Sequence, residues 1–165
     1  MKKPILNIDD ARLMPFGQGN KFAASLGQIG KHIGMEKLGC MVTIVEPGKS
    51  AFPFHVHHMN EEMFVILEGQ GDYRFGEETY PIKAGDVLAA PPGGAERAHQ
   101  ITNTGSTTLK YLGISTKAQP EVVEYPDSDK FAVFSRSTDG SPMTAQLRFI
   151  GRTETTLDYW DGEDA

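Results

Sequence analysis

The chain has 165 residues, the size of one domain with at most a modest extension. Its 16 Lys and Arg against 22 Asp and Glu give a formal net charge of −6, which argues against a nucleic-acid partner, since phosphate binding needs a basic face. A hydrophobic fraction of 39% is enough for a packed core and excludes a chain that is disordered throughout.

Short apolar-rich segments, separated by turn residues, follow one another along most of the chain. Turn signals containing Gly or Pro recur about every 8–12 residues, which is typical of an antiparallel sandwich or barrel. No segment keeps the helical period of about 3.6 residues over several turns, so helix is expected to be minor. We predict an all-β protein with strands over residues 22–29, 38–46, 54–58, 62–67, 70–75, 79–82, 86–90, 98–102, 108–115, 130–134 and 145–150.

Acidic residues are concentrated towards the end of the chain. Residues 1–117 carry 12 basic and 12 acidic side chains, whereas residues 118–165 carry four basic and ten acidic ones. We expect this acidic extension to be solvated, or to be anchored by Tyr159 and Trp160 to the body or to a second subunit. The predicted organisation is an N-terminal arm or strands over 1–37, a barrel core over 38–117, and an acidic C-terminal extension over 118–165 that packs on the barrel or on a dimer partner.

The sequence shows no sign of export or membrane insertion. Cys40 is the only cysteine, which excludes an intramolecular disulfide framework. The longest strongly apolar run, residues 63–67, is far shorter than the ~20 residues that a membrane-spanning helix needs. No apolar run follows the two lysines at the start of the chain, as it would in a signal peptide. We therefore expect a cytoplasmic protein with no membrane partner.

Three of the five histidines lie within four residues, in a segment that reads as a strand. Because strand side chains alternate between faces, His55 and His57 share one face, with their α-carbons about 6.6 Å apart at ~3.3 Å per residue. Two imidazoles at that spacing can converge on one metal ion. His58 then points to the opposite face, and the isolated His32 is expected to be exposed.

Glu62 and His99 extend this candidate metal site. Glu62 shares its strand face with Phe64 and Ile66, which places one carboxylate at the mouth of an otherwise apolar inner face. A buried carboxylate is costly unless it is compensated, and a divalent cation is one way to do so. His99 lies downstream in another predicted strand. The sequence therefore predicts a metal site that includes histidines and Glu62.

The spacing of these residues resembles the two motifs of the cupin family. The residues that match the first motif are Gly48, His55, His57, Glu62 and Gly69. Those that match the second are Gly85, Pro91, Gly93, His99 and Asn103, with a longer stretch than usual before the histidine. Segments 125–128 and 159–163 are also similar to those of small single-domain bacterial cupins.

The resemblance implies a cupin-type double-stranded β-helix, which is a jelly-roll barrel, with short helical or irregular terminal segments. It also implies one divalent transition metal per chain, for which Mn, Fe, Ni and Zn are candidates. Three imidazoles and a carboxylate suit several such ions, so the ligand set does not choose among them. The metal ligands implied are His55, His57, Glu62 and His99.

Four protein ligands on an ion that accepts six leave two positions for a small oxygen-rich molecule or dioxygen. We therefore expect a metalloenzyme, and the resemblance implies dioxygenase, oxalate decarboxylase or sugar isomerase chemistry. The alternative is a non-catalytic module that binds a small molecule. Arg97, beside His99, is a candidate for holding a substrate anion, and the sequence identifies no catalytic residue.

The strand that carries Glu62 also suggests how the chain assembles. Met63, Val65 and Leu67 have the opposite parity to Glu62, so they face away from the inferred metal site. Three large apolar side chains on an outer face need a cover, supplied either by residues 118–165 or by a second subunit. Closed two-fold dimers are the commonest oligomers, and we expect a homodimer whose interface includes the C-terminal strands.

Overall fold

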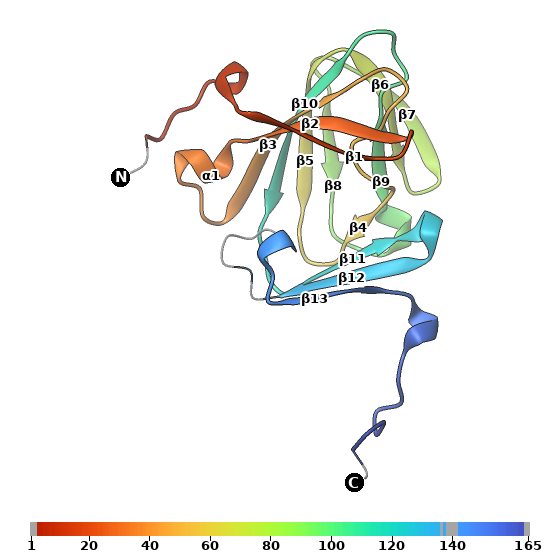
Figure 1. The fold of residues 1–165 in the computed structure, drawn as a ribbon. Helices are drawn as coiled ribbons and strands as arrows, with labels where there is room; N and C mark the ends of the chain where they lie inside the picture. The colour runs from red at the N-terminus through yellow and green to blue at the C-terminus, as the bar shows by residue number, and fades with distance from the viewer. Residues whose placement is uncertain (1–2, 136, 138–141, 164–165) are drawn as a thin grey trace.

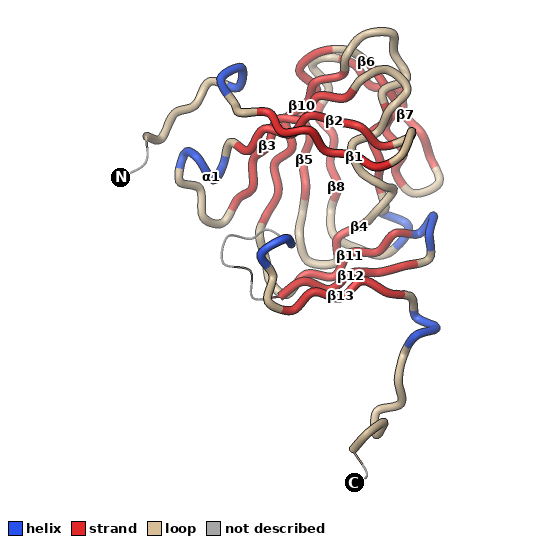
Figure 2. The backbone as a smooth tube through the Cα atoms, in the orientation of Figure 1, coloured by secondary structure: helices blue, strands red, loops and turns tan. Residues whose placement is uncertain are grey.

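The computed structural model describes residues 3–135, 137 and 142–163. In these ranges most of the regular secondary structure is β-strand, and the described helices are short turns between or beside strands (Figure 1, Figure 2). The helices are η1 (Ile8–Asp10), α1 (Gly30–Ile33), η2 (Ala95–Arg97), η3 (Pro126–Ser128), η4 (Pro142–Thr144) and η5 (Thr153–Thr155). The strands are β1 (Leu13–Gln18), β2 (Phe22–Gln28), β3 (Leu38–Val45), β4 (Val56–His57), β5 (Glu62–Glu68), β6 (Gln70–Phe75), β7 (Glu78–Lys83), β8 (Val87–Ala90), β9 (His99–Thr102), β10 (Leu109–Thr116), β11 (Glu121–Tyr125), β12 (Lys130–Ser135) and β13 (Leu147–Gly151).

The predicted all-β class and eleven predicted strands are confirmed, with small differences at their ends. Two strands were missed. β1 contains Pro15 and Gly17, which read as turn residues, and it lies exposed at the edge of its sheet, where proline is tolerated. β11 is short, carries two glutamates and becomes a strand by pairing with β4 and β12.

Two antiparallel sheets pack face to face and enclose the main core. One has six strands in the order β1-β2-β3-β10-β5-β8, and the other has three in the order β7-β6-β9. Phe64 and Ile66 are buried between them, as their parity predicts, whereas Met63 lies on the outer face and is 40% exposed. The other large core side chains are Val45, Tyr73, Ile82, Leu88, Ile101, Leu109 and Tyr111.

A third sheet, in the order β13-β12-β11-β4, lies across one end of the sandwich, at the bottom in Figure 1. β4 joins it because Val56 and His57 pair with Glu124 and Val123 of β11. The first part of the acidic extension therefore forms a β-sheet next to the predicted histidines, rather than a solvated tail. Its own core consists of Val123, Ala132 and Phe134.

The outer face of the six-stranded sheet is covered in part by the N-terminal residues. Ala11, Ile29 and Val42 form a small core there, and Leu6 and Ile8 pack against it. The described C-terminal strands instead build their hydrophobic cluster within their own sheet. Met63 is 40% exposed, so the described residues of the C-terminal extension leave it at least partly uncovered.

The segment after β13 leaves the third sheet and extends away from it (Figure 2). Leu157, Tyr159 and Trp160 are 74%, 83% and 67% exposed. The rings of Tyr159 and Trp160 contact each other edge-on, 4.8 Å apart, and do not anchor the segment to the body of their own chain. Among the described residues, no helix has the length and apolar character needed to cross a membrane.

Candidate metal site

Backbone pairing places His55 and His99 side by side. Each donates its backbone N–H to the carbonyl of the other, at 3.1 and 2.8 Å, which makes them directly opposite partners in an antiparallel bridge. Opposite partners point to the same face, and the two ring centroids are 4.6 Å apart. The segment before β4 and the start of β9 thus bring together two histidines that are 44 positions apart.

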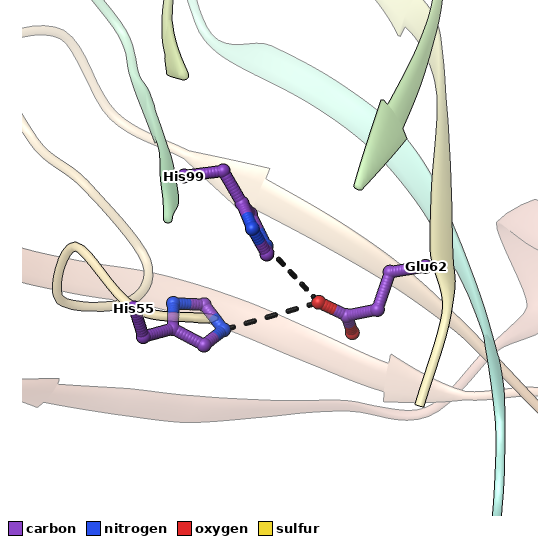
Figure 3. A group of neighbouring side chains, drawn as sticks. All are labelled: His55, Glu62 and His99. Carbon is purple, nitrogen blue, oxygen red and sulfur yellow. Dashed lines mark hydrogen bonds and ion pairs between the residues drawn. The ribbon is translucent and has the colours of Figure 1, made fainter. Parts of the chain in front are cut away.

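Glu62, the first residue of β5, points towards this histidine pair (Figure 3). Its Oε2 lies 3.1 Å from Nε2 of His99 and 3.9 Å from Nε2 of His55. One potential ligand atom from each of these three residues lies within 4.8 Å of the others. This arrangement can hold a metal ion.

His57 reaches the same carboxylate from β4. Its Nε2 lies 3.4 Å from Oε2 of Glu62, and its Nδ1 lies 3.4 Å from Oε2 of Glu121. The imidazole therefore lies between two carboxylates. Glu62 is the point at which the ring nitrogens of all three histidines converge.

Glu121 is a residue that the sequence reasoning missed. It is 6% exposed, and its carboxylate accepts hydrogen bonds from the backbone N–H groups of Met59, Asn60 and Val122. The side-chain amide of Asn60 donates to it as well. No local pattern marks Glu121, because it reaches the site only through the pairing of β11 with β4.

Electrostatics distinguish the two neighbouring histidines. Burial, reinforced by the adjacent His99, lowers the pKa of His55 to about 3, so this ring is neutral at pH 7. Burial also disfavours the charged form of His57, but the neighbouring carboxylates of Glu121 and Glu62 outweigh it and raise the pKa of His57 to about 9. The pKa of Glu62 is lowered because its contacts with His57 and His99 outweigh the effect of burial.

The tautomer of His55 shows that the site fits a cation. Its Nδ1 is 2.8 Å from the carbonyl oxygen of Pro53, which can only accept, so the proton of the neutral ring is on Nδ1. Nε2 then presents a lone pair towards Oε2 of Glu62. These two acceptor atoms, 3.9 Å apart, could both bind a cation placed between them.

The space behind the histidines is small. A cavity of about 20 Å³ lies inside the sandwich, with room for about one water molecule. Its lining is mostly apolar: Phe52, His55, Phe64, His99, Gln100, Ile101 and Tyr111. An organic ligand therefore has no room to bind in the core behind the histidines.

Other residues singled out in the sequence lie outside this cluster. His58 points away, as its parity predicts, and contacts Glu124 at 2.7 Å in an exposed pair. His32 is exposed. Arg97 is held by a 2.8 Å hydrogen bond to the carbonyl oxygen of Pro92 and lies 3.9 Å from Glu96. Asn103 is fully buried and its amide donates to two backbone carbonyls, which is a structural role.

Comparison with known proteins relates the central part of the chain to a family. Residues 41–115 match the cupin domain family, and this range contains all three histidines and the glutamate of the cluster. Over these residues the chain resembles the cupin domain, and its fold is a jelly roll of the cupin type.

Among curated proteins, the chain is 37% identical over 68 residues to an oxalate-binding protein from Thermotoga maritima, covering 41% of this chain and 54% of that protein. The chain spans about half the length of the curated relatives it matches.

Two solved structures resemble nearly the whole chain. One is a protein from Acidithiobacillus ferrooxidans, provisionally assigned as a sugar phosphate isomerase, with a TM-score of 0.77, 24% identity and coverage of 94% of this chain and 96% of that one. The other is a sugar phosphate isomerase of the cupin superfamily from Silicibacter pomeroyi, with a TM-score of 0.76, 21% identity and coverage of 96% and 98%. At these identities the likeness establishes the fold.

Proposed function

We propose that the protein is a metal-binding cupin in which His55, His57, Glu62 and His99 hold one divalent transition metal, from the group Mn, Fe, Ni and Zn. The observation that carries this proposal is the convergence of three histidine Nε2 atoms on Oε2 of the partly buried Glu62. The neutral Nδ1-protonated ring of His55 supports it, because its free lone pair already faces that oxygen.

The function proposed is that of a metalloenzyme acting on a small oxygen-rich organic molecule. A metal held by four protein ligands supplies open coordination positions and Lewis-acid or oxygen-activating chemistry. The protein fixes the ligand orientations, since the Pro53 carbonyl holds His55 and Glu121 holds His57. Aromatic side chains behind the histidines keep bulk water out of the core. The relatives described above are named for oxalate and sugar phosphates, which are small oxygen-rich molecules.

A non-catalytic small-molecule-binding module is the second candidate. The small aromatic cavity favours it, since there is no room behind the histidines to enclose a substrate. Turnover distinguishes the two candidates: NMR of oxalate and of sugar phosphates incubated with metal-loaded protein shows new products only for an enzyme. Iron in the purified protein favours oxygen chemistry, and manganese favours decarboxylase or isomerase chemistry.

The test of the metal site is elemental analysis of purified variants. His57→Ala and Glu62→Ala are each expected to lower bound metal about tenfold or more, because each removes a ligand from the coordination shell. His58→Ala and His32→Ala serve as controls and should keep full metal content, since both side chains lie outside the cluster. Equal metal loss in all four variants would show that the histidines bind metal non-specifically.

A further inference from the structure

One face of the third sheet carries residues that neither motif includes. Tyr125 lies on the same face of β11 as Glu121, which contacts His57. The strand register places Lys130 of β12 directly opposite Tyr125. Phe134 of β12 lies opposite Glu121 on one side and opposite Arg148 of β13 on the other. Since opposite residues share a face, Tyr125, Lys130 and Arg148 all lie on the side of the sheet that faces the metal site.

Tyr125 connects this face to the candidate metal site. Its ring is stacked against that of His55, with centroids 6.2 Å apart and an interplanar angle of 26°. The ammonium group of Lys130 lies 4.9 Å from the centre of the Tyr125 ring. Arg148 lies on the same face of the sheet two strands away, on β13, in register with Phe134 of β12 and Glu121 of β11.

The two cations are available to a ligand. Within the described parts of the chain, neither Lys130 nor Arg148 forms an ion pair, and the Tyr125 hydroxyl makes no hydrogen bond. Other cations are already engaged: Arg74 makes a double contact with the Asp127 carboxylate, at 2.9 and 3.0 Å. Two unpaired cations and an unpartnered hydroxyl beside a metal site provide the donors that an oxyanion requires.

We propose that Tyr125, Lys130 and Arg148 form an anion-binding subsite that holds a carboxylate or phosphate group of the ligand while its other oxygen atoms reach the metal. Only the contact between the ligand and the metal rests on the proposed function. The subsite itself consists of residues outside the metal ligand set and can be tested without it.

The experiment is calorimetric titration of the full chain, with its metal content measured, using inorganic phosphate in one series and malonate in another. We expect at least one of these anions to bind, and the responding series shows whether the subsite takes phosphates or carboxylates. Lys130→Gln and Arg148→Gln should each raise the Kd about tenfold, since each removes a charge-assisted hydrogen bond. Tyr125→Phe, which keeps the stacked ring, should raise it less.

Lys83→Gln is the matched control, because Lys83 is exposed and lies at the opposite end of the β6–β7 pair from the end next to His99. It should leave anion binding unchanged. The proposal is overturned if neither anion binds, or if Lys83→Gln weakens binding as much as Lys130→Gln does. Repeating the titration on Glu62→Ala separates the two proposals: anion binding that persists without metal supports the subsite even where the metal assignment fails.

Discussion

His57 lies between two carboxylates that come from different parts of the sequence. Glu62 belongs to the predicted metal cluster, whereas Glu121 comes from β11 and is held by three backbone N–H groups. A carboxylate on Nδ1 of a histidine keeps the ring oriented, so that Nε2 points to the metal position. Glu121 is therefore a positioning residue in the proposed site.

Replacing Glu121 tests this role. Glu121→Gln is expected to weaken metal affinity about tenfold, because it removes the charge that orients His57. The measurement is competition with a chelator, together with the His57 ring signals in NMR, which report the tautomer. Glu124→Gln is a matched control, since Glu124 is also on β11 and pairs with His58, in an exposed position away from the site. Equal losses of affinity in both variants would contradict the positioning role.

The metal-free protein should be most stable near pH 6.5. His57 has its pKa raised from 6.5 to about 9, so its contribution to stability is present below 6.5 and is lost as pH rises through 9. His55 has its pKa lowered from 6.5 to about 3, so its contribution is present above 6.5 and is lost as pH falls towards 3. Urea unfolding of chelator-treated protein measures both limbs.

Variants show which histidine causes the loss of stability on the alkaline side and which causes it on the acidic side. His57→Gln should flatten the alkaline limb and keep the acidic one, whereas His55→Gln should weaken the acidic limb. An alkaline limb that survives in His57→Gln would show that another group causes it.

At the level of single elements, β11 is decisive for the site. It pairs with β4, which carries His57, and it supplies both Glu121 and Tyr125. Val123, directly opposite His57 and 4% exposed, attaches this strand to the core of the third sheet. The packing of β11 therefore holds one side of the proposed metal site in place.

Val123→Ala is expected to lower the free energy of unfolding by about 2 kcal/mol, because it leaves a cavity in a packed cluster. Its neighbour Val122 points to the other face of β11 and is only partly buried, so Val122→Ala should cost clearly less. Urea unfolding of the metal-free forms compares the two. Identical losses would mean that the third sheet does not pack through its Val123 face.

At the scale of the whole molecule, apolar surface remains uncovered in a single chain. Met63 and Val87 are 40% and 62% exposed on or beside the outer face of β5. The terminal segment adds Leu157, Tyr159 and Trp160, all more than half exposed. Apolar groups in such numbers are typical of an interaction surface. The proposed homodimer gives them a partner.

Sedimentation equilibrium at tens of micromolar tests the assembly. We expect a species of twice the chain mass, and we expect Trp160→Ser to shift it towards the monomer, because it removes a large apolar contact. Tyr80→Ser, at a half-exposed aromatic on β7, is the control and should leave the mass unchanged. A one-chain mass for the unaltered protein would reject the dimer.

Much of the fold follows from local patterns that the sequence displays directly. Side chains alternate along a strand, so parity alone separates His55 and His57 from His58, and Phe64 and Ile66 from Met63. Gly and Pro mark the turns between strands because few other residues adopt those backbone conformations. The motif spacing, together with this alternation, was sufficient to predict the all-β class and to nominate the residues of the cluster.

Only the tertiary structure revealed what surrounds that cluster. The hydrogen bond between Asn60 and Glu121 spans 61 positions, and no local period encodes such a pairing. The same holds for Tyr125 and Lys130, which reach the site because β11 pairs with β4 on one side and β12 on the other. Hydrophobic alternation specifies which face of a strand is buried, whereas the choice of its partner depends on how all the faces pack together at once. The sequence by itself therefore determined most of the strands and the nominated ligands, and the packing decided which carboxylate, tyrosine and cations lie beside them.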